Sequence, residues 1–264
     1  MAGLRRRNPI ARLVVTALAL LSVLAGCETT PSKEAPTPRD GKARENAQLQ
    51  TQLGISYMRQ GKLERALQRF QSAETVDPTY APAQNALGLL YERLRQPQEA
   101  GRRYRRATEL DPTFASARNN YGGWLCRTGE FAEAEAQFRA AAENPLYDVP
   151  HLALFNAGVC MQRKGDNAAA MKYFRRCLDR NPKFSQSLYA LSALNLTEKN
   201  YLSARAYFQR YLEVGQHTPK TLWLGIRIER ILGDKNAVSS YSMLLRRKYP
   251  DSKEAQRLRV SDRQ

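Results

Sequence analysis

The sequence repeats itself every 34 residues, and this period constrains the fold more than any other feature. Three motifs carry it: an apolar segment containing glycine, a segment with alanine and an aromatic residue, and an Asp-Pro or Asn-Pro turn. They occur as "LGISY" (53–57), "LGLLY" (87–91) and "YGGWL" (121–125), as "ALQRFQSA" (66–73), "AGRRYRRA" (100–107), "AEAQFRAA" (134–141) and "AMKYFRRC" (170–177), and as "DPTY" (77–80), "DPTF" (111–114) and "NPKF" (181–184). Such a period is typical of arrays in which each unit buries its apolar face only by stacking on its neighbours.

Small and aromatic residues recur at fixed positions in each unit, which we number from Ala47. Position 8 is glycine or serine in five units, position 20 is alanine or valine, position 24 is aromatic in five units, and position 32 is proline in four. This pattern resembles the tetratricopeptide repeat (TPR), a helix–turn–helix unit in which small residues let two helices approach. Proline at position 32 ends the second helix, because proline cannot continue one. The resemblance implies an all-α fold, a TPR solenoid of six repeats wound as a right-handed superhelix.

The repeat boundaries follow from this register. We predict that the repeats occupy residues 47–252 and that a C-terminal tail follows at 253–264. The six repeats are 47–80, 81–114, 115–148, 151–184, 185–218 and 219–252. Two extra residues, Val149 and Pro150, separate repeats 3 and 4. Repeat 6 has Ser242 at the aromatic position, a divergence expected of a terminal capping repeat.

The first 26 residues have the pattern of a secretory signal peptide. Three arginines (5–7) precede the apolar segment 13–25, which is shorter than the roughly 20 residues that cross a bilayer. Leu24-Ala25-Gly26-Cys27 resembles the bacterial lipobox, which implies a diacylglycerol and an N-acyl lipid on Cys27 as membrane anchor. Glu28 in place of Asp implies sorting to the periplasmic face of the outer membrane of a Gram-negative bacterium. The alternative is an ordinary signal peptide with an incidental cysteine.

A flexible linker is predicted between the leader and the repeats. Residues 28–45 contain three prolines and almost no apolar side chains, a composition typical of a solvated tether. We therefore assign 27–46 to the acylated cysteine and its linker.

The chain is strongly basic. Its formal charge of +17 falls to +13 when four arginines leave with the leader. Export excludes nucleic acid as a partner, which leaves anionic lipids, cell-wall polymers or acidic protein segments, or a charge that only keeps the protein soluble. The repeats contain no metal-ligand spacing, phosphate-binding loop or nucleophile elbow. We therefore expect a monomer that is not an enzyme and has no metal, no small-molecule substrate and no cofactor besides the lipid on Cys27.

The face lined by the first helices is the predicted binding site. Position 13 is arginine in four successive repeats, and asparagines recur at positions 5 and 6 beside apolar residues. Amides can bond an extended peptide backbone, arginines can pair with its carboxylates, and apolar pockets can take its side chains. The predicted groove residues are Ile55, Met58, Arg59, Asn85, Leu89, Arg93, Asn119, Asn120, Arg127, Phe155, Asn156, Val159 and Arg163. Alternatively, the arginines are solvated rim charges and the asparagines brace neighbouring helices.

Two cysteines are predicted to pair. Cys126 and Cys160 occupy position 12 of repeat 3 and position 10 of repeat 4, so they lie at a similar height on adjacent first helices. In an oxidising periplasm we expect a disulfide between them. The alternative is that both are small core residues, as we expect for Cys177.

Two segments resemble a particular family. "NNYGGWLCRTGEFAEAEAQFRAAAENPLY" (119–147) and "LGIRIERILGDKNAVSSYSMLLRRKYPDS" (224–252) resemble the third and last repeats of the PilF/PilW family of type IV pilus biogenesis lipoproteins. The resemblance implies a pilotin, an outer-membrane lipoprotein that binds the pilus secretin subunit and promotes its localisation and multimerisation, as pilus biogenesis and twitching motility require. It also implies a cysteine pair that Cys126 and Cys160 match. The alternative is a TPR scaffold lipoprotein of another envelope complex, serving outer-membrane protein insertion or peptidoglycan-linked assembly.

Overall fold

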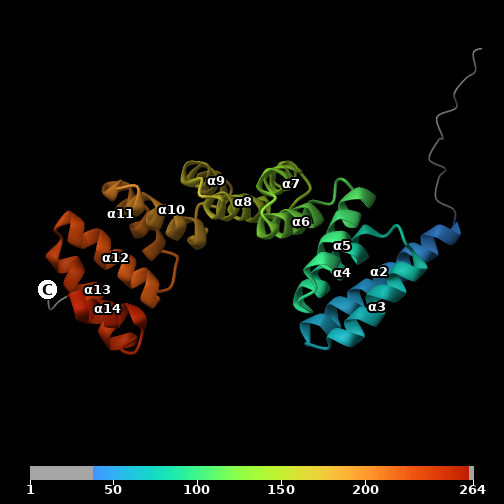
Figure 1. The fold of residues 1–264 in the computed structure, drawn as a ribbon, viewed down its shortest axis with the longest axis horizontal. Helices are drawn as coiled ribbons and strands as arrows, with labels where there is room; N and C mark the ends of the chain where they lie inside the picture. Colours follow the sequence, from blue (N-terminus) through green and yellow to red (C-terminus); the bar gives the residue numbers. More distant parts are fainter. Residues whose placement is uncertain (1–37, 262–264) are drawn as a thin grey trace, which may run out of the picture. The chain divides into compact units, whose positions relative to one another are not determined.

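The computed structural model describes residues 38–261. The predicted signal peptide, the lipidation site Cys27 and the first part of the predicted linker lie outside this range. From Lys42 onward the chain forms one compact unit. The described part is all-α and contains thirteen helices (Figure 1): α2 (Pro38–Arg59), α3 (Leu63–Val76), α4 (Ala81–Arg93), α5 (Pro97–Leu110), α6 (Ala115–Thr128), α7 (Phe131–Glu143), α8 (Pro150–Lys164), α9 (Asn167–Arg180), α10 (Ser185–Thr197), α11 (Tyr201–Leu212), α12 (Pro219–Leu232), α13 (Lys235–Lys248) and α14 (Lys253–Ser261).

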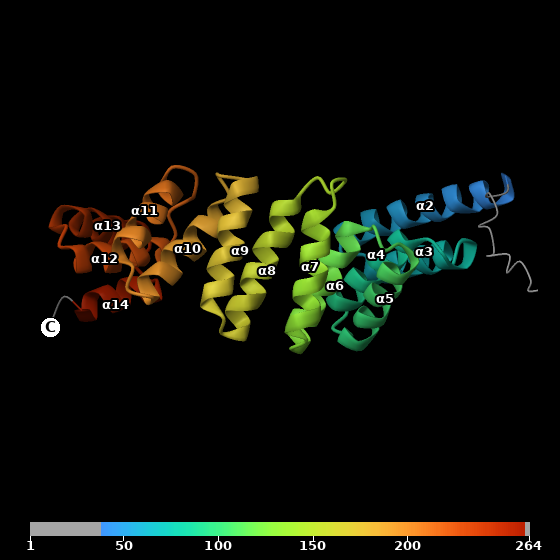
Figure 2. The same ribbon diagram turned by 90° about the horizontal axis from the view of Figure 1, so that it is seen from above.

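The helices pack in consecutive pairs, as a TPR array requires. The pairs α4/α5, α6/α7, α8/α9, α10/α11 and α12/α13 each pack together, and each second helix also contacts the first helix of the next pair. Figure 2 shows α6 to α9 standing side by side in this order. First helices contact one another as well, α4 with α6, α6 with α8 and α10 with α12. The predicted TPR fold is therefore confirmed.

The small and aromatic positions explain why the two helices of a repeat can approach so closely. A Cβ atom on Gly88 would lie 2.5 Å from the ring of Tyr104, and one on Gly158 would lie 2.5 Å from the ring of Phe174. Both distances are too short for real atoms, so position 8 must stay small where position 24 is aromatic. The aromatic residues at position 24 are almost fully buried: Phe70, Tyr104, Phe138, Phe174 and Phe208.

Two kinds of turn set the register of the array. Inside each repeat, position 15 has a positive φ, which glycine adopts most easily and which ends the first helix. The residues are Gly61, Gly129, Gly165 and Gly233, with Arg95 and Lys199 in repeats 2 and 5. Between repeats, the Asp77 carboxylate accepts hydrogen bonds from the backbone N–H and the hydroxyl of Thr79, at 2.9 and 2.7 Å. Asp111 and Thr113 repeat this turn, which explains the "DPT" motif.

The structure differs from two predicted boundaries. Helix α2 begins at Pro38, inside the segment 27–46 that we predicted to be a flexible linker. Proline is tolerated at the start of a helix, and the fully buried Ala47 packs with Ala73 and Ala83, so α2 has a surface to rest on.

The predicted C-terminal tail at 253–264 is also helical over α14. Ala255 and Leu258 of α14 are buried against Leu222 and Ile226 of α12 and Leu245 of α13. The last repeat has an apolar face that no further repeat covers, and α14 covers it. The helical array therefore extends beyond the predicted range of 47–252 at both ends, from Pro38 to Ser261. The prolines of the predicted linker and the end of the 34-residue register had suggested the shorter range.

Candidate partner-binding site

The asparagines of consecutive repeats are hydrogen-bonded to one another. Asn120 on α6 donates through Nδ2 to Oδ1 of Asn85 on α4 at 2.9 Å. Asn156 on α8 donates in the same way to Asn119 on α6 at 3.0 Å. The partners are 35 residues apart in the first pair and 37 in the second, because the two extra residues before repeat 4 lengthen the interval. These bonds brace adjacent first helices, which was the alternative role for the asparagines.

Three of the four predicted arginines also reach the preceding first helix. Arg93 donates through Nη1 to the carbonyl oxygen of Met58 at 2.7 Å, and Arg163 makes a long bond of 3.5 Å to the carbonyl oxygen of Arg127. Arg127 forms an ion pair with Glu92. The last carbonyl groups of a helix lack partners within it and attract cations, so the C-terminal turn is a favourable place for a guanidinium group. The arginines therefore connect neighbouring repeats while staying exposed at the surface.

A pocket of about 240 Å³ opens where these residues meet, and we call it the polar pocket. It is lined by Leu89 and Glu92 of α4, Tyr104 of α5, Asn119, Asn120, Gly123, Cys126 and Arg127 of α6, Phe138 of α7, and Asn156, Val159 and Arg163 of α8. Seven of the predicted groove residues are brought together here: Leu89, Asn119, Asn120, Arg127, Asn156, Val159 and Arg163. The pocket combines amide groups, two guanidinium groups and apolar walls, which is the chemistry needed to hold a peptide.

Glu92 is a polar-pocket residue that the sequence analysis missed. Burial raises the pKa of its carboxyl group, and the opposing effects of Arg127 and of a hydrogen bond with Tyr104 are smaller. Burial also raises the pKa of the Tyr104 hydroxyl, and the charge of Glu92 adds to this. Glu92 occupies position 12 of its repeat, the same position as Cys126 in the next repeat. This shared position was the sequence signal that could have identified it.

The other predicted residues lie outside the polar pocket. Met58 is only 6% exposed and belongs to a core cluster with Phe70 and Leu87, against which Ile55 also packs. Asn85 is 8% exposed, because Asn120 and the helix packing cover it. Arg59 and Arg93 are exposed. The groove residues predicted in repeats 1 and 2 are therefore mostly core residues or exposed arginines, and of these only Leu89 lines the polar pocket.

Phe155 lies in a second pocket of about 500 Å³, which we call the aromatic pocket. It is lined by Phe155, Val159 and Gln162 of α8, Phe174 of α9, Ser185, Gln186, Tyr189, Ala190 and Ala193 of α10, Tyr211 of α11, and Thr218, Lys220 and Thr221 at the start of α12. Of these, only Phe155 and Val159 were predicted. Because Val159 lines both pockets, the polar and aromatic pockets are neighbours across α8.

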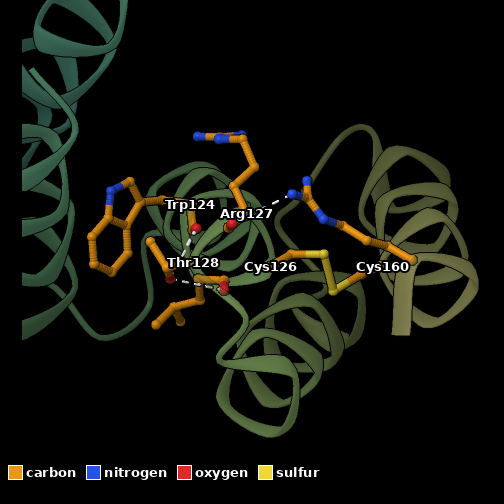
Figure 3. Close-up of a disulfide and its surroundings, with 7 residues drawn as sticks. Trp124, Cys126, Arg127, Thr128 and Cys160 are labelled. Atoms are coloured by element: carbon orange, nitrogen blue, oxygen red, sulfur yellow. Dashed lines mark hydrogen bonds between the residues drawn. A yellow bond between two sulfur atoms is a disulfide. The ribbon is translucent and has the colours of Figure 1, made fainter. Parts of the chain in front are cut away.

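A disulfide joins the two first helices that carry most of the polar pocket. Figure 3 shows Cys126 of α6 bonded to Cys160 of α8, with Arg127 and Thr128 beside it. The Cα atoms are 5.7 Å apart, within the usual range for a disulfide. Cys177 is buried with a free thiol, and burial raises its pKa. Cys126 lines the polar pocket, so the bond fixes part of the pocket wall.

Within residues 38–261, no helix is both long and apolar enough to cross a bilayer. No group of three His, Cys, Asp or Glu side chains there is arranged to hold a metal ion.

Comparison with known families gives matches to tetratricopeptide repeats over residues 54–94, 85–148 and 152–183. A type IV pilus assembly protein, PilF of Pseudomonas aeruginosa, is 30% identical over 238 residues, which cover 90% of this chain and 94% of that protein.

Solved structures give the same result. The structure of Pseudomonas aeruginosa PilF is similar with a TM-score of 0.75 and 29% identity, over 83% of this chain and 99% of that chain. PilW, described as a widely conserved type IV pilus biogenesis factor, is similar with a TM-score of 0.71 and 29% identity, over 80% of this chain and 97% of that chain. MamA, at 19% identity and a TM-score of 0.54, is similar in fold alone.

Proposed function

Because the chain belongs to the PilF/PilW family of type IV pilus assembly proteins, we propose that it is a pilotin, an outer-membrane lipoprotein that binds the pilus secretin subunit. The observation that carries the proposal is the 30% identity to PilF over nearly the full length of both chains. Members of this family are non-enzymatic TPR proteins, as we expected from the absence of catalytic motifs in the sequence.

The proposed mechanism begins at the membrane. Acyl chains on Cys27 hold the protein at the periplasmic face of the outer membrane, and the TPR array provides the binding surface. A secretin subunit carries membrane-seeking strands whose unpaired edges invite aggregation before the assembly closes. A lipid-anchored partner raises the local concentration of subunits at the correct membrane and so favours their assembly there.

The polar pocket supports a role in binding an extended segment of the partner. Its asparagines and arginines already use some of their hydrogen-bonding groups within the array, but Asn119, Asn120 and Asn156 remain partly exposed. A peptide carboxylate entering the pocket would meet Arg163 and would compete with Glu92 for Arg127. A preformed surface of this kind binds without a large ordering cost.

The proposal is tested by deleting the gene and measuring SDS-resistant secretin multimers and twitching motility. We expect both to be lost in the deletion strain and restored by the wild-type gene. A Cys27→Ser gene should leave the protein without palmitate label and fail to deliver secretin to the outer-membrane fraction. Intact multimers together with full motility in the deletion strain would rule out the pilotin function.

A further inference from the structure

The aromatic pocket has the build of a binding site for a side chain from another molecule. Its volume of about 500 Å³ lies within the range of ligand pockets, and aromatic rings form its walls. Two small side chains, Ala190 and Ala193 of α10, line it together with the rings of Phe155 on α8 and Tyr189 on α10. Both alanines are partly exposed, so the pocket is open to solvent.

The walls of this pocket are held in place by their own contacts. The ring of Phe155 lies 5.6 Å from that of the fully buried Phe174, and the ring of Tyr189 lies 6.1 Å from that of Tyr211. The Tyr211 hydroxyl donates a hydrogen bond of 2.6 Å to the carbonyl oxygen of Gln216. A ligand side chain would therefore enter a shape that is already formed.

The position of the pocket on α8 indicates what kind of molecule fits. Phe155, Val159 and Arg163 are spaced four residues apart, so they form one stripe along α8. Val159 is 44% exposed and lines both pockets, while the exposed Arg163 lines the polar pocket. A chain that crosses α8 at Val159 would have a cation on one side and an apolar hollow on the other.

Charges around the aromatic pocket favour an acidic partner. Lys220 lies at its rim, and none of the side chains that line the pocket is acidic. Arg163 adds a second cation on the side of the polar pocket, and the chain without its predicted leader has a formal charge of +13. Opposite charges on the partner would steer it to this surface.

We propose that the two pockets form one bipartite site for an extended peptide, in which a carboxylate binds at Arg163 and an aromatic or large aliphatic side chain enters the aromatic pocket. The inference deepens the proposed function, because it specifies the chemistry of the partner segment that the groove would hold. Binding at this site is non-covalent.

The test uses the full mature chain from residue 27, in oxidised form, with Cys27→Ser to keep it unacylated. The probes are short peptides, acetylated at the N-terminus and amidated at the C-terminus. Each contains one Asp and one Phe separated by one, two or three residues, and all other positions are serine. Two matched series replace Asp with Asn or Phe with Ser. Binding is followed by NMR shifts of the methyl groups of Val159, Ala190 and Ala193, with Ala132 on α7 as the internal reference.

We expect at least one Asp/Phe probe to shift these three methyl groups in wild-type protein, and to bind several-fold more tightly than its Asn or Ser counterpart. Ala193→Trp, which fills the aromatic pocket, should weaken that probe at least tenfold, while Ala132→Trp should leave it unchanged. Arg163→Gln should weaken the Asp probe and have little effect on the Asn probe.

Equal binding of the Phe and Ser series, or shifts that avoid Ala190 and Ala193, would overturn the inference. The wild-type shifts decide the matter even if Ala193→Trp fails to fold. If the probes fail while gene deletion still abolishes secretin multimers, the bipartite site is wrong and the proposed function stands.

Discussion

At the scale of single residues, each of the first four repeats depends on one aromatic ring packed against one glycine. Phe138 is 1% exposed, and a Cβ atom on Gly122 would lie 3.0 Å from its ring. Motif spacing in the sequence was enough to predict this pairing, because both residues lie in the same repeat. The roles of Asn119, Asn120 and three of the arginines could not be decided in this way, because their partners lie in a neighbouring repeat.

Phe138→Ala should lower the free energy of unfolding by about 3–5 kcal/mol, because it leaves a cavity between packed helices. Chemical denaturation followed by circular dichroism measures the effect. Leu146→Ala is the control, since Leu146 is 87% exposed and should change stability little. Superimposable unfolding curves for Phe138→Ala and wild type would contradict the packing described here.

At the scale of elements, α14 acts as the cover of the last repeat. Leu258 is fully buried and packs with Leu222, Ile226 and Leu245, whereas Val260 on the same helix is 61% exposed. The sequence analysis missed α14 because the 34-residue register ends before it. Its apolar residues Ala255 and Leu258, three positions apart, were the signal that remained.

Leu258→Ala should destabilise the C-terminal repeat by about 2–5 kcal/mol, through loss of buried apolar contacts. Because neighbouring repeats stabilise one another, the effect should be strongest next to the change. Hydrogen exchange should therefore accelerate in α12 and α13, and much less in α4 and α5. Val260→Ala should leave exchange unchanged, and equal protection of α12 in both variants would argue against a covering role for α14.

At the scale of the whole molecule, stability comes mainly from contacts between neighbours, and the disulfide adds a covalent link to this series. The two cysteines are 34 residues apart, and closing a loop of this length is worth on the order of 3–4 kcal/mol in the chain-entropy account. Its position was predictable because repeat register places both residues at a similar height. The pockets were less predictable, since each is lined by side chains from at least four helices.

Reducing agent should therefore lower the melting temperature of the wild-type protein, and Cys126→Ala/Cys160→Ala should melt at the same lower temperature with or without it. Cys177→Ala is the matched control, because Cys177 is a free thiol and its loss should preserve the response to reductant. Identical wild-type melts in oxidising and reducing buffer would show that the bond does not form or contributes nothing.

The early start of α2 has a consequence for where the proposed lipoprotein can work. If Cys27 carries the acyl chains, only ten residues separate it from the first residue of α2 at Pro38. At 3.3–3.6 Å per residue, this linker spans at most roughly 35–40 Å when fully extended. That is about half the span of a linker extending to residue 46. The start of α2 could then lie no farther than this shorter span from the acylated cysteine, so a client would meet the first repeat close to the bilayer surface.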